Sequence, residues 1–169
     1  MNAELDLLGL LAGTLERFGL RPGDVTIRLS HRDAAASVLQ GLGVNEDQLH
    51  AAFTLLDRKE KMPAEVFADK AQPLGLGPDE IEKLNAVLSS SGTTDALAQT
   101  MNGLGLSTEG LAPLFDLAHP LRDAGLQDWV TFDPGIVRGL AYYTGTVFEV
   151  HERRGACLLY TSPSPRDDL

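Results

Sequence analysis

The residues best suited to chemistry lie together in one segment, VRGLAYYTGTVFE. Arg138 offers a planar, permanently charged guanidinium that suits a phosphate or a carboxylate. Gly139 and Gly145 allow close backbone approach or a positive φ. Tyr142 and Tyr143 are adjacent in a predicted strand and point to opposite faces, so one can pack while the other lines a pocket with its hydroxyl. The segment predicts a small-molecule site on a sheet, although the residues alone also allow a buried aromatic strand with one surface arginine.

Short β-rich stretches surround this segment. Trp129 to Phe132 is β-rich, DPG is a turn signal, and Thr146 to Val150 alternates apolar and polar residues. Nearer the start of the chain, leucines at spacings of three and four between Leu5 and Leu15 predict an amphipathic helix that stops at Gly19. Alternation then predicts a strand over 25–29.

The middle of the chain, 33–125, has the texture of short helices separated by turns. Asn45 is predicted to cap a helix, with Gln48 as its capping-box partner. Pro63 and Pro78 are each predicted to be a first helical residue, where proline loses no needed N–H. A later helix over 109–124 is expected to be interrupted or kinked at its two prolines, Pro113 and Pro120.

The order of elements predicts an α+β fold in which the flanking strands belong to one antiparallel sheet and the helices form an insertion. We expect a helix-strand-helix segment over 1–42, a helical insertion domain over 43–125 and further sheet strands over 126–155. Residues 156–169 are expected to lie outside the fold.

Composition indicates a globular protein, with 43% hydrophobic and 22% charged residues in 169. The formal net charge is −10, and the cations are scattered. Because a nucleic-acid-binding chain usually carries a basic patch, composition alone argues against such a partner. The one cysteine, Cys157, offers neither a disulfide nor a zinc cluster, so no metal site is expected. The absence of a signal peptide or membrane-length apolar run favours a cytoplasmic location.

Two polar residues at the end of the first predicted strand, His31 and Arg32, are further candidates for ligand contact. At a strand end that leads into a helix at Asp33, such residues are more often simply exposed. We therefore expect them to be surface residues.

The segment VRGLAYYTGTVFE resembles the histidine-specific signature of histidyl-tRNA synthetases, R-G-L-x-Y-Y-x-x-T-V-F-E. DVTIRLSHR is similar to the part of these enzymes that follows motif 2, and LLDRKEKMPAEVF with GLGPDEIEKL resembles their helical insertion domain. The resemblance covers roughly residues 3–154. It implies part of a class II synthetase catalytic domain, with an antiparallel sheet and an all-helical insertion.

The resemblance also implies roles for residues of the signature. Arg138 matches the arginine that contacts the α-phosphate of ATP and the carboxylate of histidine, in catalysis and in binding both substrates. Tyr142 and Tyr143 match the pair that lines the histidine pocket. Ala141 stands where some members carry an acidic residue, which we interpret as tolerated variation. Glu149 closes the motif, and an outward surface position is an equally good interpretation of it.

The implied activity is that of a histidine–tRNA ligase, with histidine, ATP and tRNA(His) as substrates, Mg²⁺ accompanying ATP, and a homodimer as the intact form. Motif 1, motif 2, the glycine-rich segment, motif 3 and the anticodon-binding domain are not found, so we expect an internal fragment that is inactive alone. The synthetase-like regulatory subunit of ATP phosphoribosyltransferase shares the fold and a version of YYTG, and is the alternative. Arg138 within RGLAYYTG favours the ligase.

The last residues, 156–169, contain CLLYTSPSPRD. This run is similar to a translated sequencing-library adaptor, which implies an artefactual tail. A Ser/Pro-rich linker is the alternative. In either case Cys157 and Tyr160 are expected to have no functional role.

Overall fold

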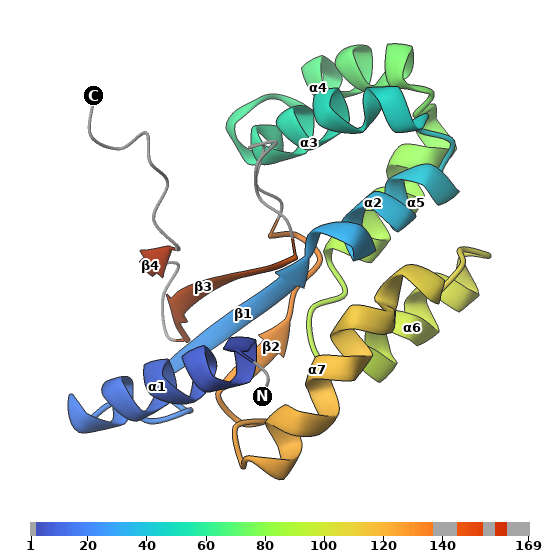
Figure 1. The fold of residues 1–169 in the computed structure, drawn as a ribbon. Helices are drawn as coiled ribbons and strands as arrows, with labels where there is room; N and C mark the ends of the chain where they lie inside the picture. The colour runs from blue at the N-terminus through green and yellow to red at the C-terminus, as the bar shows by residue number, and fades with distance from the viewer. Residues whose placement is uncertain (1–2, 137–144, 154–157, 162–169) are drawn as a thin grey trace.

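The structure, a computed structural model, describes residues 3–136, 145–153 and 158–161. A sheet of four strands packs against helices, while no described helix lies beside β3 and β4 at its other side (Figure 1). The strands are β1 (Val25–His31), β2 (Val130–Phe132), β3 (Thr146–Glu152) and β4 (Leu158–Thr161). The helices are α1 (Ala3–Arg17), α2 (Arg32–Gly41), α3 (Leu49–Asp57), α4 (Ala64–Ala71), α5 (Pro78–Leu88), α6 (Thr94–Gly103) and α7 (Ala112–Asp123). The predicted α+β class is confirmed.

The sheet has the order β2-β1-β3-β4. β1 pairs antiparallel with β3 along its whole length, from Val25 opposite Glu152 to His31 opposite Thr146. The pairing of β1 with β2 is parallel, which corrects the expectation of a purely antiparallel sheet. A parallel pair needs a long crossover connection, and the helices between these two strands provide it.

The side chains of β1 alternate between an apolar face and a polar face of the sheet. Val25, Ile27 and Leu29 are at most 1% exposed and belong to the hydrophobic core. Phe148 and Val150 lie opposite Leu29 and Ile27 on the neighbouring strand and pack in the same core. Because successive side chains of a strand point to opposite faces, the intervening residues of β1 face the other side.

The first helix and strand form where the sequence predicts them. α1 buries Leu8 and Ala12, four residues apart, and other leucines of the same helix pack partly against the core. After the helix ends, Gly19 adopts a φ of 84°, a left-handed conformation that glycine accepts without a Cβ clash. This helix-to-strand unit contains β1, which is one of the two inner strands of the sheet.

Several predicted helix boundaries need correction. Asn45 makes no capping bond, since its side chain bonds instead to that of Gln48 at 3.3 Å, and a 3₁₀ turn over Glu46–Gln48 precedes α3. Pro63 is the residue before α4 and not its first residue, whereas Pro78 does begin α5. α7 continues through Pro120, so the expected interruption there is absent.

The helices and the sheet share one hydrophobic core. Buried residues of α1, β1 and every later helix belong to a single cluster. α7 contacts both α1 and β1, while α6 contacts α7. The loop before α6 also touches the sheet, because Gly92 forms an antiparallel bridge with Phe132 of β2. The predicted helical insertion and the sheet therefore share core residues, and the division at 42 and 125 stays a prediction.

Candidate functional site

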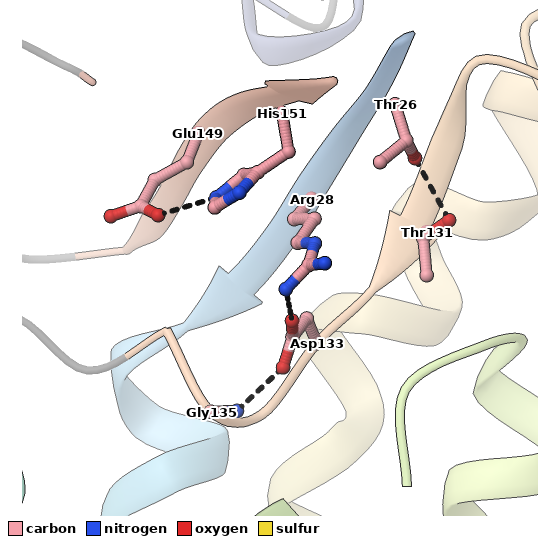
Figure 2. A network of polar contacts seen from close by, with 7 residues as sticks. All are labelled: Thr26, Arg28, Thr131, Asp133, Gly135, Glu149 and His151. Atoms are coloured by element: carbon pink, nitrogen blue, oxygen red, sulfur yellow. Dashed lines mark hydrogen bonds and ion pairs between the residues drawn. The ribbon is translucent and has the colours of Figure 1, made fainter. Parts of the chain in front are cut away.

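The polar face of the sheet is the candidate site. Side chains from three strands and the turn after β2 meet there, and we call this set the polar face: Thr26, Arg28, Thr131, Asp133, Glu149 and His151 (Figure 2). The pairing explains the set, since Arg28 lies opposite Thr131 on one side and opposite Glu149 on the other. Paired residues of neighbouring strands share a face of the sheet.

Arg28 and Asp133 form the central contact of the polar face. The Nη1 atom of Arg28 lies 3.2 Å from Oδ2 of Asp133, and the side chains are 42% and 8% exposed. The other carboxylate oxygen of Asp133 accepts a 2.8 Å hydrogen bond from the N–H of Gly135. A buried carboxylate needs such partners, because desolvation disfavours its charged form. The guanidinium remains accessible enough to contact an anionic ligand as well.

Glu149 and His151 form a second pair on β3. They are two residues apart, so their side chains share a face, and the Nε2 to Oε2 distance is 2.8 Å. The side chains are 13% and 17% exposed, which corrects the interpretation of Glu149 as an outward surface residue. A carboxylate beside an imidazole can fix the orientation of the ring. The imidazole can then accept or donate a proton.

Thr26 and Thr131 complete the polar face. Their hydroxyl oxygens are 3.0 Å apart across β1 and β2, and either can donate the bond. This contact joins the parallel strands through their side chains. The polar face is therefore held by pairwise contacts on each side of β1.

The structure also describes the residues on either side of the stretch 137–144 of the signature segment. Before it, the N–H of Ile136 donates to the carbonyl of Asp133 at 3.2 Å. After it, the carbonyl of Gly145 accepts from the N–H of Arg32 at 3.0 Å, and Oγ1 of Thr146 donates to Glu4 at 2.6 Å. The two ends are thus tied to β1, α2 and α1.

Residues 137–144 of the signature segment lie outside the described part of the structure. They include Arg138, Tyr142 and Tyr143, which carry the predicted catalytic and substrate-binding roles. Gly145 is described and has a φ of 82°, as the prediction of positive φ requires. The role assignments of the other three remain predictions.

His31 and Arg32 are not the exposed residues that the sequence suggested. His31 is 8% exposed and caps α2, its Nδ1 accepting from the N–H of Asp33 at 3.2 Å. The guanidinium of Arg32 lies 4.2 Å from the centre of the Phe53 ring, a cation–π contact with α3. Burial lowers the pKa of Arg32, and the nearby Asp33 carboxylate acts in the opposite direction. Both side chains serve packing at the junction of sheet and helices.

The sequence contained signals for the residues that were missed. The alternation V-T-I-R-L places Thr26 and Arg28 on one face of β1, yet nothing local marks their partners about a hundred residues later. Asp133 was interpreted only as part of a turn. In the described residues no group of three His, Cys, Asp or Glu side chains is arranged to hold a metal ion. Nor is any described helix sufficiently long and apolar to cross a membrane.

The family model that matches this chain and the relatives that resemble it are described as the same family. A family model described as histidyl-tRNA synthetase matches residues 1–158. The chloroplastic/mitochondrial histidine–tRNA ligase of Arabidopsis thaliana is 34% identical over 155 residues, covering 92% of this chain and 31% of the relative. The ligase of Opitutus terrae is 37% identical over 159 residues, covering 91% of this chain and 36% of the relative. The chain therefore spans about a third of the length of these relatives.

Solved structures have the same fold. A Bacillus halodurans C protein, described as an ATP phosphoribosyltransferase regulatory subunit/histidyl-tRNA synthetase, matches with a TM-score of 0.71 and 25% identity over 93% of this chain and 41% of its own. The histidyl-tRNA synthetase of Nostoc sp. PCC 7120 matches with a TM-score of 0.71 and 23% identity, covering 88% of this chain and 36% of its own. At that identity the second match supports the fold alone. Taken with the family model, which spans the described helices and strands β1 to β3, these matches show that the chain belongs to the histidyl-tRNA synthetase family.

Proposed function

We propose that the protein to which this chain belongs is a histidine–tRNA ligase, and that this chain supplies one wall of its active site. The observation that carries the proposal is the family match over residues 1–158, which includes the complete signature RGLAYYTGTVFE. In the proposed reaction a carboxylate oxygen of histidine attacks the α-phosphorus of ATP and pyrophosphate leaves. A ribose hydroxyl of tRNA(His) then attacks the carbonyl carbon of the adenylate, and AMP leaves.

In this proposal Arg138 acts on the first step. Attack on the α-phosphorus increases negative charge on its equatorial oxygens, and a preorganised guanidinium stabilises that charge. Tyr142 and Tyr143 line the histidine pocket, where a phenolic hydroxyl bonds an imidazole nitrogen. A pocket built to bond that nitrogen rejects analogues that lack it, because its own polar groups would then stay unpaired.

The polar face extends the same wall in our proposal. Asp133 is buried and bonded to Arg28 shortly before the signature begins, while Glu149 closes the signature on β3 and pairs with His151. Because the chain enters and leaves the signature at the sheet, these contacts support a role for the polar face in positioning it. Mg²⁺ enters bound to ATP in this scheme, and it needs no dedicated cage of protein ligands.

The location, assembly and domain division are also proposals. We propose a cytoplasmic homodimer for the intact protein, with the helical insertion over 43–125 directed to tRNA. The catalytic part comprises 1–42 and 126–155, and 156–169 is an artefactual tail. Two facts bear on the tail: the family match ends at residue 158, and Leu158–Thr161 pairs with β3.

The regulatory subunit of ATP phosphoribosyltransferase is the second candidate, supported by the likeness to the Bacillus halodurans C structure, whose description names both proteins. Histidine-dependent ATP–pyrophosphate exchange by a full-length protein that contains this segment separates the two. The ligase shows exchange, whereas the regulatory subunit shows none and instead alters the activity of an added ATP phosphoribosyltransferase. The 169-residue chain alone is expected to show no exchange, because the other regions of the ligase contribute to the site.

A further inference from the structure

A pocket lies between the start of α6, helix α7 and the outer edge of β2. Its volume is about 180 Å³. A cavity of roughly 150 Å³ accommodates benzene, so this pocket has room for one or two small amino-acid residues. We propose that it binds the carboxyl-terminal end of an extended peptide, which adds to the edge of β2.

The edge of β2 has backbone groups directed away from β1. The N–H of Ile27 bonds to the carbonyl of Trp129, and the N–H of Asp133 bonds to the carbonyl of Leu29, so alternate residues of β2 face β1. Phe132 faces the other way and exchanges two 2.8 Å bonds with Gly92. By the same alternation Val130 presents its N–H and C=O to the outer side, where it lines the pocket.

The path of the chain after Gly92 explains why no described segment pairs with the outer side of Val130. An antiparallel neighbour that pairs Gly92 with Phe132 would place Thr94 opposite Val130. Thr93 instead caps α6, with its hydroxyl accepting from the N–H of Ala96 at 3.2 Å, and the chain turns away into the helix. Among the described residues the ladder therefore stops after a single bridge. A bound peptide strand would continue it with the same geometry.

The side chains around the pocket select the end of a peptide. Arg122 and His119 lie three residues apart on α7 and line the pocket, as does the amide of Gln127. Within the described residues the side chains of these three make no hydrogen bond or ion pair. A guanidinium suits a terminal carboxylate through a charge-assisted, bidentate contact.

The remaining lining residues fit a small apolar side chain and a backbone amide. Phe115 and Val130 are half-buried and Phe132 is buried, which gives an apolar floor. Thr94 is 6% exposed, lines the pocket, and has no side-chain hydrogen bond to another described residue. Asp95 is the one acid in the lining, and it disfavours the carboxylate. Its replacement by asparagine is expected to strengthen binding.

The test uses two peptides that differ only at the end, acetyl-Ala-Leu with a free carboxylate and the same peptide as its amide. Amide chemical shifts of the 169-residue chain are followed during titration. We expect saturable shifts at Val130 and Gly92 with the carboxylate, and binding of the amide weaker by about tenfold or more. Equal affinity for the two peptides, or no shift at Val130, would overturn the proposal.

Two variants locate the contacts. Arg122→Gln is expected to weaken carboxylate binding by about tenfold, whereas Arg17→Gln, the same change on exposed α1, leaves it unchanged. Val130→Pro removes the outward N–H without removing a bond to β1, since proline is tolerated on an edge strand. It should abolish the shift at Gly92. If Val130→Pro unfolds the chain, Arg122→Gln still decides, and unchanged affinity there contradicts the proposal.

Discussion

Thr146 and Glu4 are 142 positions apart in the sequence, and the hydroxyl of Thr146 donates a 2.6 Å hydrogen bond to the Glu4 carboxylate. This contact joins the first turn of α1 to the first residue of β3, which belongs to the signature segment. Beside it, the carbonyl of Gly145 accepts from the N–H of Arg32. Contacts from α1 and α2 thus hold the point at which β3 begins.

Thr146→Val should lower the free energy of unfolding by about 1 kcal/mol, because it removes a hydrogen bond to a charged group while keeping the shape of the side chain. Urea denaturation followed by circular dichroism measures the change. Thr14→Val is the matched control, since its hydroxyl bonds only to the carbonyl of Leu10 within the exposed turn of α1. Equal effects of the two substitutions would show that the contact to Glu4 contributes nothing specific.

Gly145→Ala tests the conformation at the same point. The φ of Gly145 is 82°, and the nearest atoms to an added Cβ are 3.9 Å away or more, so the cost is conformational and not steric crowding. We expect a loss of about 1–2 kcal/mol. Gly13→Ala lies within α1 with nothing within 4 Å of the new Cβ, and it should stabilise by about 0.5–1 kcal/mol. Thermal unfolding of both variants distinguishes the two signs, and a stabilised Gly145→Ala protein would contradict the assigned φ.

Arg28→Met should destabilise the fold more than the loss of an exposed ion pair would. Among the described residues it leaves the Asp133 carboxylate, 8% exposed, with only the N–H of Gly135 as partner. Because Arg28 is itself 42% exposed, solvent compensates in part, and we expect about 1–3 kcal/mol.

Arg21→Met is the control for this substitution. Arg21 pairs with Glu16 at 3.1 Å, but the side chains are 70% and 58% exposed, so the expected loss is below about 0.5 kcal/mol. The two unfolding midpoints in urea are compared at the same pH. If both arginines can be replaced at the same small cost, the polar face is not held by the Arg28–Asp133 contact.

His31→Ala should cost about 1 kcal/mol, because His31 caps α2 through Nδ1. His31→Asn places another cap-forming residue there and should recover most of the loss. Guanidinium unfolding of the three proteins gives the comparison. A loss in the asparagine variant as large as that in alanine would assign the effect to lost packing of the ring.

The sequence predicts the local elements of this protein better than their partners. α1 follows from the spacing of its leucines, and the start of α5 follows from Pro78, because these signals are contained within a few residues. The direction of β2 does not follow from such signals. A three-residue strand carries no mark of whether its neighbour is parallel, and the answer depends on how the intervening helices return the chain.

The candidate site divides in the same way. The chemistry of the signature can be inferred from Arg138 and the two tyrosines, whereas the pairs Arg28–Asp133 and Glu149–His151 depend on strand register. His31 illustrates the limit: a polar residue at a strand end is usually exposed, but here it is buried because its ring nitrogen satisfies the first turn of α2. The capping bond is itself local, since it joins residues two positions apart, but the residue types at the strand end do not reveal it.

The most direct test of the proposed function is histidine-dependent ATP–pyrophosphate exchange by a full-length ligase that contains this segment, with and without Arg138→Ala. Loss of the guanidinium is expected to reduce the rate by about a hundredfold or more. Tyr143→Phe should mainly raise the KM for histidine, and Arg17→Ala should leave the rate unchanged. Exchange at near wild-type rate in the Arg138→Ala enzyme would contradict the account.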